Sequence, residues 1–299
     1  TPRVMENFGL SYETLKSINP RLVMISLSGY GQEGSWRDYV AFGMSTEQMS
    51  GVAHLTGYEN EGPLYTGMTG GDLFSGVMGA IDLVAALWQR EQTGLGQHLD
   101  FSQIEACNMY VGDAMTGWSL TSFDPERTGN DHPVYLLQGM FPCIDDGWIG
   151  ISCKDEQQIK ALAGYFKEPA ILESGLTKSE KLQCISGYTQ QQDKMELMNE
   201  LQQLGVPAGA VLNGPELLNN EQLIARDAFL AQDRPGLGVK HYPSQPYRFR
   251  LSEKPPTLRA PLLGEHLEEI LTERAGLNSD EIAELIIDDV IGTVPISAR

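Results

Sequence analysis

The longest hydrophobic stretch of the chain covers residues 73–88 and predicts a helix. Apolar residues lie nearly all round this helix, which is typical of a helix buried between other layers. Gly70-Gly71-Asp72 comes immediately before it, so the carboxylate of Asp72 is expected just ahead of the first helical turn. Unpaired backbone N–H groups and the helix dipole favour a negative charge at that end. The pattern leaves two roles for Asp72, a helix cap or a reacting group.

Two predicted strands flank this helix in the sequence. Residues 22–27 are hydrophobic at consecutive positions, as buried parallel strands are, and residues 97–101 follow the helix after a Gly-rich stop that begins at Gly94. Further helices are predicted at residues 11–18, at 44–53, and from a Ser102 cap to about residue 118. We take these elements as one part of the chain, residues 1–120.

A glycine pattern follows the first predicted strand. Gly29-Tyr30-Gly31-Gln32-Glu33-Gly34 matches the G-x-G-x-x-G fingerprint of dinucleotide-binding proteins. A true fingerprint opens an apolar helix, whereas residues 35–39 are polar and aromatic. We therefore interpret the match as coincidental; a dehydrogenase would bind a nicotinamide nucleotide, which a fluorescence titration tests.

The second half of the chain has a different pattern. Ser, Asp, Pro, Gly and Asn cluster at residues 121–132 and predict a linker. Beyond it we predict a smaller α+β domain over residues 133–218, with strands at 135–143, 148–152 and 206–211 and helices at 156–166 and 190–204. The remaining chain, residues 219–299, is predicted as a polar helix, Pro-rich segments, and acidic helices at 265–273 and 279–286.

The composition argues against two classes of partner. Forty acidic residues against 21 basic ones give the 299-residue chain a formal charge of −19. Such a surplus repels nucleic acid and anionic membranes, so neither is an expected partner. It also opposes the binding of a polyphosphate unless local cations or oriented backbone N–H groups overcome it.

Cysteine spacing and hydropathy bear on metals and location. No C-x-x-C pair or zinc-type His spacing accompanies the scattered cysteines, Cys107, Cys143, Cys153 and Cys184. We therefore expect reduced thiols and no metal. The apolar stretch carries Asp82 and is expected to be too short to span a bilayer. No signal peptide is recognised, which predicts a cytoplasmic location.

Residues 66–76, which contain the Asp72 segment, resemble the active-site segment of the class III CoA-transferases, also called the CaiB/BaiF family. Further motifs stand in the family's order and spacing: Asn19-Pro20-Arg21-Leu22-Val23, Ser28-Gly29-Tyr30-Gly31-Gln32, Thr93-Gly94-Leu95-Gly96-Gln97-His98-Leu99-Asp100, Val206-Pro207-Ala208-Gly209 and Ala260-Pro261-Leu262-Leu263-Gly264-Glu265-His266. The resemblance implies an α/β fold, with a Rossmann-like large domain and a smaller α+β domain. Residues 219–299 would return to pack on the large domain.

The resemblance also bears on the start of the chain. It implies that about the first hundred residues of the usual subunit are missing, which would leave an incomplete sheet with an exposed edge. The chain would then be a fragment, one part of a longer or fused polypeptide, or a chain whose start was not recorded. As partners, the resemblance implies an interlocked homodimer or the rest of a longer or fused polypeptide. Asn7 occupies a position where many members carry an Arg that helps to bind CoA.

The resemblance implies the chemistry of Asp72. In the family this Asp is the nucleophile, and CoA moves from an acyl-CoA donor to a carboxylic acid acceptor through an aspartyl-CoA thioester. Coenzyme A therefore enters as a substrate. Covalent catalysis of this kind divides one difficult transfer into easier steps. The surrounding motifs favour the nucleophile over the helix cap, while the donor and acceptor acids are not specified.

Other site residues follow from their place near the motif. We expect Arg37, Phe42, Gly43 and Gly71 to contact CoA; a solvated surface position is the alternative for Arg37. Glu47 and Gln48 are candidates for binding the acceptor carboxylate or the anhydride, with a solvated helix face as the alternative.

Further residues have both a structural and a chemical interpretation. The segments Gly129-Asn130 and Gln138-Gly139 are the nearest candidates for the family's mobile glycine loop, which supplies oxyanion donors, although plain turn residues are the favoured alternative. His54 could serve as a general base, but a structural His at a helix end is the favoured interpretation.

Three competing functions remain. An acyl-CoA racemase of the same fold has a His about thirty residues before its Asp, to form a proton-transfer pair, whereas this chain has Phe42 there. A CoA-linked lyase or hydrolase would couple transfer to a second reaction. A non-catalytic fragment would keep the fold without binding CoA.

Overall fold

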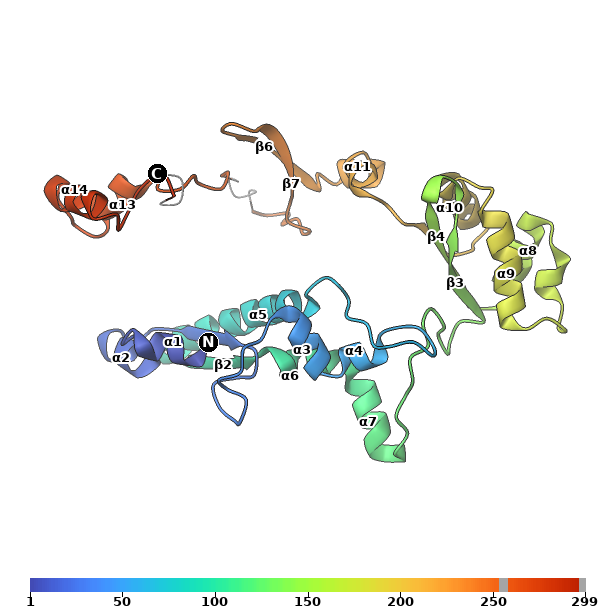
Figure 1. Ribbon diagram of the computed structural model, residues 1–299, viewed down its shortest axis with the longest axis horizontal. Helices are drawn as coiled ribbons and strands as arrows, with labels where there is room; N and C mark the ends of the chain where they lie inside the picture. The colour runs from blue at the N-terminus through green and yellow to red at the C-terminus, as the bar shows by residue number, and fades with distance from the viewer. Residues whose placement is uncertain (253–257, 296–299) are drawn as a thin grey trace. The chain divides into compact units, whose positions relative to one another are not determined.

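The computed structural model describes residues 1–252 and 258–295 (Figure 1). The chain forms two compact units, Thr1–Val211 and Leu212–Arg299. Each unit contains both helices and strands, as the α/β prediction requires. The predicted linker at residues 121–132 and the predicted domain end at residue 218 stay predictions.

The first part of unit 1 alternates helices and strands. Its elements are α1 (Pro2–Asn7), α2 (Tyr12–Ile18), β1 (Met24–Ser28), α3 (Gly43–Met49), α4 (Val52–Leu55), α5 (Gly70–Thr93), β2 (His98–Ser102), α6 (Gln103–Asn108), η1 (Met109–Val111) and α7 (Gly112–Thr121). The two predicted strands are confirmed, with small shifts of their ends.

Strands β1 and β2 form a parallel pair in which Met24 lies opposite His98 and Ser28 opposite Ser102. Helix α5, the last of the three helices between them in sequence, packs on β1 through Gly79, where a methyl group would lie 2.9 Å from Cδ2 of Leu27. The carboxyl ends of both strands therefore lie at the same edge, where open α/β sheets bind ligands.

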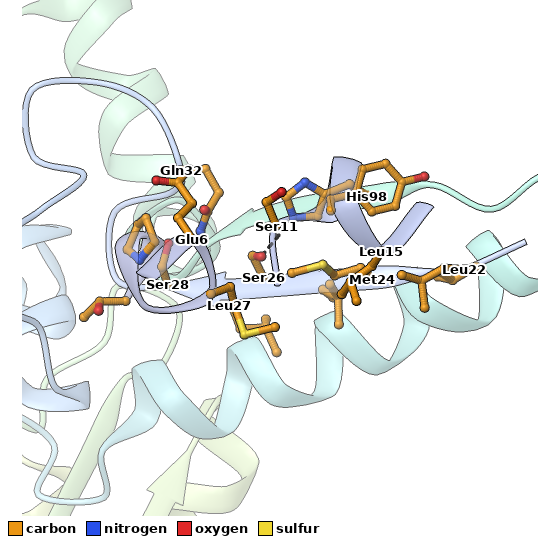
Figure 2. Close-up of a pocket in the computed structure, with 16 residues that line it drawn as sticks. Glu6, Ser11, Leu15, Leu22, Met24, Ser26, Leu27, Ser28, Gln32 and His98 are labelled. Atoms are coloured by element: carbon orange, nitrogen blue, oxygen red, sulfur yellow. Dashed lines mark hydrogen bonds between the residues drawn. The ribbon is translucent and has the colours of Figure 1, made fainter. Parts of the chain in front are cut away.

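A cavity of about 370 Å³ lies over one face of this pair (Figure 2). It is lined by residues of α1, α2 and β1, and by His98. Oγ of Ser26 and Nε2 of His98 share a hydrogen bond of 2.9 Å, and the His98 ring stacks on Tyr12 with centroids 5.2 Å apart. Among the residues that line this cavity there is no member of the predicted site.

Helix α5 begins earlier than predicted, so Asp72 lies inside its first turn. The helix starts at Gly70, and Thr69 occupies the N-cap position without a side-chain cap. The helix-cap interpretation of Asp72, and its expected place ahead of the first turn, are therefore wrong. Gly94 ends the helix in a left-handed conformation, φ 75°, and its N–H donates to the carbonyl of Arg90, as the sequence predicts.

The length and exposure of α5 correct two further expectations. By length and composition alone, this 24-residue helix is apolar enough to cross a membrane, so the expectation that it is too short was wrong. A core helix of a soluble protein passes the same test. The expectation that α5 is buried on all sides is correct for one face only. The side chains on the opposite face are exposed: Leu73, Val77, Ile81, Val84 and Trp88.

Two predicted helices are interrupted in the structure. The helix expected at residues 44–53 divides into α3 and α4 at Gly51, whose φ of 90° is readily adopted only by glycine. The helix expected from Ser102 to residue 118 consists of α6, η1 and α7. Ser102 precedes α6, as predicted, but its side chain makes no cap hydrogen bond.

The later part of unit 1 has its own sheet and helices. Its elements are β3 (Leu137–Pro142), η2 (Ile144–Asp146), β4 (Trp148–Cys153), α8 (Glu156–Phe166), η3 (Pro169–Leu172), α9 (Lys178–Thr189), α10 (Lys194–Gln203) and β5 (Ala208–Ala210). The strands form an antiparallel sheet in the order β3-β4-β5. Helix α9 was not predicted, although Thr177 and Glu180 form the capping box that opens it.

The core of this sheet-and-helix region consists of large aliphatic and aromatic side chains. They are Leu137, Phe141, Ile149, Ile151, Leu162, Phe166, Ile171, Ile185, Leu197, Leu201 and Val206. Most are fully buried, so the region contains a continuous apolar core of its own.

Unit 2 combines short helices with a hairpin. Its elements are α11 (Gly214–Leu218), α12 (Glu221–Ala225), β6 (Phe229–Arg234), β7 (Gly238–Pro243), α13 (Leu267–Glu273) and α14 (Ser279–Ile287). The two acidic helices and the polar helix near its start are confirmed. The antiparallel hairpin β6-β7 was not predicted; Gly236 and Gly238 give its turn the positive φ values that it needs.

Candidate active site

Asp72 is exposed at the start of α5, and other elements contact both of its carboxylate oxygens. Oδ1 accepts a hydrogen bond of 3.0 Å from Nε2 of Gln103, the first residue of α6. Oδ2 lies against Gly43, the first residue of α3, because a methyl group there would be only 2.6 Å from this oxygen. The carboxylate therefore sits where the beginnings of α3, α5 and α6 meet.

The segment before Asp72 is fixed by the carboxylate of Glu47. Oε1 of Glu47 accepts hydrogen bonds from the Thr66 hydroxyl, at 2.9 Å, and the Gly70 N–H, at 2.6 Å. Oε2 accepts one from the Thr66 N–H, at 2.8 Å. Glu47 is only 2 % exposed, so the solvated-face alternative is wrong for this residue.

The ionised form of Glu47 is favoured by these contacts. Burial alone raises the pKa of this carboxyl, but the hydrogen bonds from Thr66 and Gly70 lower it by more, and the net pKa lies below its ordinary value. Between the two anchored residues, Thr69 adopts φ 50° and ψ 46°. This left-handed conformation is uncommon for a β-branched residue and of the kind found at functional sites.

Gly71 faces the protein interior. A methyl group at this position would lie 2.0 Å from Oγ1 of Thr46 and 3.1 Å from Sγ of Cys107. Both neighbours are buried, and burial raises the pKa of the Cys107 thiol. Close packing of α5 on α3 and α6 thus accounts for the glycine, while a CoA contact at Gly71 stays a prediction.

The remaining predicted residues differ in their exposure. Phe42 immediately precedes α3 and is 72 % exposed. Arg37 is half-buried in the loop between β1 and α3, with Nε 3.9 Å from Oδ1 of Asp38. Gln48 is exposed on α3. His54 lies in the last turn of α4, with Nε2 3.7 Å from Oδ2 of Asp124, so its expected place at a helix end is confirmed, while its structural role stays a prediction.

Gly139 does not lie in a loop or a turn. It lies within β3, opposite Ile151, and is buried. A methyl group at this position would be 2.8 Å from Cζ of Phe141, so the Phe141 ring would have to shift to make room for it. The two interpretations of Gly139 from the sequence, a residue of a mobile glycine loop and a turn residue, are therefore wrong, because its backbone belongs to a strand.

The G-x-G-x-x-G loop has no phosphate-binding architecture. The Gln32 N–H donates to both carboxylate oxygens of Asp100, at 2.9 and 3.1 Å, and is therefore already bound to an anion. A turn follows the loop, and the next helix begins only at Gly43. The interpretation of this match as coincidental is confirmed by the missing helix.

Sequence reasoning missed Gln103 and Thr66. Gln103 comes two residues after the strand predicted at 97–101, and the edge where parallel strands end is a common place for functional residues, so its position offered a signal. Thr66 belongs to the motif around Asp72, but its pairing with Glu47, nineteen positions earlier, depends on tertiary structure.

Comparison with known proteins identifies the family. The family model described as CoA-transferase family III matches residues 1–267. This chain belongs to CoA-transferase family III. It is a CoA-transferase. Over 302 residues it is 30 % identical to the succinyl-CoA–D-citramalate CoA-transferase of Chloroflexus aurantiacus, and the match covers 97 % of this chain and 74 % of that protein.

A second relative and a solved structure agree. The succinate–glutarate CoA-transferase of Agrobacterium fabrum is 27 % identical, over 90 % of this chain and 69 % of that protein. The crystal structure of a CAIB/BAIF family protein from Brucella suis matches with a TM-score of 0.79 and 25 % identity, covering 92 % of this chain and 72 % of that one. The predicted family and the mixed α/β fold are thus confirmed; the finer Rossmann-like description stays a prediction.

Proposed function

We propose that Asp72 is the nucleophile through which this CoA-transferase moves CoA from an acyl-CoA to a carboxylic acid. The observation that carries the proposal is the setting of its carboxylate: exposed in the first turn of α5, held through Oδ1 by Gln103, and packed through Oδ2 on Gly43. The start of a helix favours the negative charge that a nucleophile needs. A fixed orientation reduces the entropy lost on reaching the reactive geometry.

The reaction begins when an Asp72 oxygen attacks the thioester carbonyl of the donor. A C–O bond forms, the C–S bond breaks, and CoA leaves as the thiolate. The thiolate then attacks the carboxyl carbon of Asp72, which releases the donor acid and forms an aspartyl-CoA thioester. This intermediate stores the CoA group on the protein between the two substrates.

The second half-reaction reverses these steps with the acceptor. The acceptor carboxylate attacks the aspartyl thioester, and CoA leaves again as the thiolate. Attack of the thiolate on the acceptor's carbonyl then forms the new acyl-CoA and frees Asp72. One acyl-CoA and one acid give one acid and one acyl-CoA, so the cycle consumes no other reactant.

The relatives suggest a class of acceptor. The two named above act, according to their names, on citramalate and on glutarate, and both molecules carry two carboxylates. We infer a short dicarboxylic acid as acceptor and succinyl-CoA as the donor to test first. Arg37 and Phe42 stay the proposed CoA contacts, and local cations are needed because the chain's charge of −19 opposes the CoA phosphates.

Glu47 receives a different role from the one expected. Its two oxygens already accept hydrogen bonds from Thr66 and Gly70, and an ionised carboxylate cannot donate to an acceptor acid. We propose that Glu47 positions residues 66–70, and thereby the first turn of α5. Gln48 and Gly139 are left without a supported part in this proposal.

The experiment that tests the proposal traps the intermediate. Purified protein is incubated with succinyl-CoA and quenched with hydroxylamine or borohydride, and its peptides are mapped by mass spectrometry. Modification is expected at Asp72 alone, and Asp72→Asn should abolish it together with turnover. Modification at another residue, or CoA transfer that persists in Asp72→Asn, would contradict the proposal.

A second measurement separates transfer from racemisation. A racemase exchanges the proton at the carbon next to the thioester carbonyl with solvent, whereas CoA transfer leaves that proton in place. Phe42, where a racemase carries His, has no group that moves a proton. We therefore expect no deuterium in the acyl chain after turnover of a 2-methylacyl-CoA in deuterated water.

A further inference from the structure

We propose that Gln103 is a catalytic residue whose side-chain amide holds Oδ1 of Asp72 and stabilises the oxyanion that forms on this atom. The inference rests on the proposed nucleophilic role of Asp72. Its basis is the hydrogen bond of 3.0 Å between Nε2 of Gln103 and Oδ1. Because an ionised carboxylate only accepts hydrogen bonds, the amide must present its N–H to it.

The backbone around Gln103 is well fixed. Gln103 opens α6 directly after β2, and β2 pairs with β1 through Ser102. The next N–H, of Ile104, donates to the carbonyl of Gly29 at 3.0 Å, which ties the start of α6 to the end of β1. A donor carried by such a position is preorganised, so it need not reorient during the reaction.

The two oxygens of Asp72 have different surroundings. Oδ1 accepts the hydrogen bond from Gln103, whereas Oδ2 lies against Gly43 and accepts no hydrogen bond from the residues that the structure describes. Oδ2 is therefore the oxygen that attacks the donor thioester. When the CoA thiolate displaces the donor acid, Oδ2 leaves with that acid and Oδ1 remains as the carbonyl oxygen of the aspartyl thioester.

The Gln103 amide then acts on Oδ1 in both half-reactions. Attack on the carboxyl carbon, by the CoA thiolate or by the acceptor carboxylate, moves the electron pair of the C=O bond onto Oδ1. The N–H of Gln103 stabilises this charge until the carbonyl re-forms and the leaving group departs. A single preorganised donor to an oxyanion accelerates a reaction by about 10²–10³-fold.

The test replaces Gln103 by methionine, which has a similar length and no N–H. Single-turnover formation of the aspartyl-CoA thioester from succinyl-CoA, followed by mass spectrometry, should slow by about 10²–10³-fold in Gln103→Met. The equilibrium dissociation constant for succinyl-CoA should stay within about twofold, because the donor acts mainly in the transition state. Gln97→Met is the matched control, since it removes an exposed amide hydrogen bond to Gln89 and should keep the wild-type rate.

A pH profile distinguishes the catalytic role from a structural one. The carboxyl introduced by Gln103→Glu can donate to Asp72 only when it is protonated, so this variant should regain activity as the pH falls, unlike the wild type. The two carboxyls titrate as a coupled pair, and the profile reports on the pair. This variant also serves if Gln103→Met does not fold.

The outcomes separate the two proposals. A wild-type adduct on Asp72 together with an unchanged rate in Gln103→Met, or a Gln103→Glu profile parallel to that of the wild type, would overturn the role of Gln103 alone. Absence of the adduct in the wild type would overturn the nucleophilic role of Asp72, and the role of Gln103 with it.

Discussion

The two parts of unit 1 are stabilised in different ways. In the region from β3 to β5, large side chains such as Ile149, Ile151 and Leu197 are fully buried. Around the candidate site, in residues 1–121, the buried apolar side chains that the structure describes are small or medium in size: Pro2, Ala53, Ala86, Ala106, Cys107 and Val111. The first region is held mainly by apolar burial, and the second must depend on other contacts.

Around the site, hydrogen bonds to carboxylates and close packing at glycines take the place of a large apolar core. Glu47 fixes the segment before Asp72, and Asp100 fixes the loop after β1 through Gln32. Gly43 and Gly71 let α3 and α5 approach more closely than any side chain would permit. Substitutions should therefore reduce stability most in the region from β3 to β5, called the α+β region below, and should alter geometry and chemistry most around Asp72.

The largest stability effect is expected in the α+β core. Leu197 is 0 % exposed, and Leu197→Ala should lower the free energy of unfolding of this region by about 2–5 kcal/mol, because it leaves a cavity. Leu204→Ala is the control on the exposed end of α10, where Leu204 is 50 % exposed and a much smaller change is expected. Chemical denaturation measures both. Equal losses of unfolding free energy in the two variants would refute the claim that apolar burial stabilises this region.

The largest effect on chemistry, apart from loss of Asp72 or Gln103, should come from Gly43→Ala. The added methyl group would lie 2.6 Å from Oδ2 of Asp72 and 3.0 Å from the Cα of Thr69, so the carboxylate must move. A displacement of about 1 Å can reduce catalysis by about 10²-fold, which equals about 2.7 kcal/mol. Steady-state kinetics should show this loss in kcat.

A nearby glycine gives the control for that prediction. A methyl group at Gly62 meets no atom within 4 Å, so Gly62→Ala should leave kcat unchanged. Full activity of Gly43→Ala would mean that Asp72 reacts from another position, and it would weaken the proposed geometry.

Removing the Glu47 anchor should have the next largest effect. In Glu47→Gln an amide N–H₂ replaces one carboxylate oxygen and faces N–H or hydroxyl donors, which should cost about 1–3 kcal/mol. The cost should appear as lower stability of the site region and reduced kcat, with little change in acyl-CoA affinity. Hydrogen exchange at residues 66–72 measures the first, and kinetics measure the second.

The same anchor predicts a pH dependence. The pKa of Glu47 lies below its ordinary value of 4.5 in the folded protein, because the three hydrogen bonds outweigh burial. Its contribution to stability is therefore present above the pKa of the unfolded chain and is lost as the pH falls through the folded value. The stability difference between wild type and Glu47→Gln should shrink as the pH falls below 4.5. A constant difference down to the folded value would contradict the ionised anchor.

The sequence was sufficient for elements with a strong local signal. Helix α8 has the predicted bounds, and Gly94 ends α5 as expected, because both depend on periodicity and a local stop signal. The position of Asp72 near a helix start was also predictable. The helix start itself was misplaced by three residues, because Gly70 and Gly71 read as a turn but have helical backbone.

Contacts between distant residues could not be predicted in the same way. Gln103 and Asp72 are 31 positions apart, and their hydrogen bond depends on how α6 and α5 pack. A charged residue on a short helix is expected to face solvent, whereas Glu47 is buried. It can be buried because its hydrogen-bond partners come from the distant segment 66–70. Gly139 lies in the strand predicted at residues 135–143, but its close contact with the Phe141 ring and its pairing with Ile151 depend on tertiary structure.

Two glycines of α5 separate the effect of packing from that of helix propensity, and one of them, Gly76, gives the smallest predicted effect. In Gly71→Ala the methyl group would lie 2.0 Å from Oγ1 of Thr46, so α3 and α5 must separate, at about 1–3 kcal/mol of stability. In Gly76→Ala it meets no atom within 4 Å, and the better helix propensity of Ala should add up to about 1 kcal/mol. Thermal unfolding should thus move in opposite directions for the same chemical change on one helix. If both variants gain stability, the close approach of α3 and α5 does not hold the site together, and Gly71 is free for the CoA contact that its motif predicts.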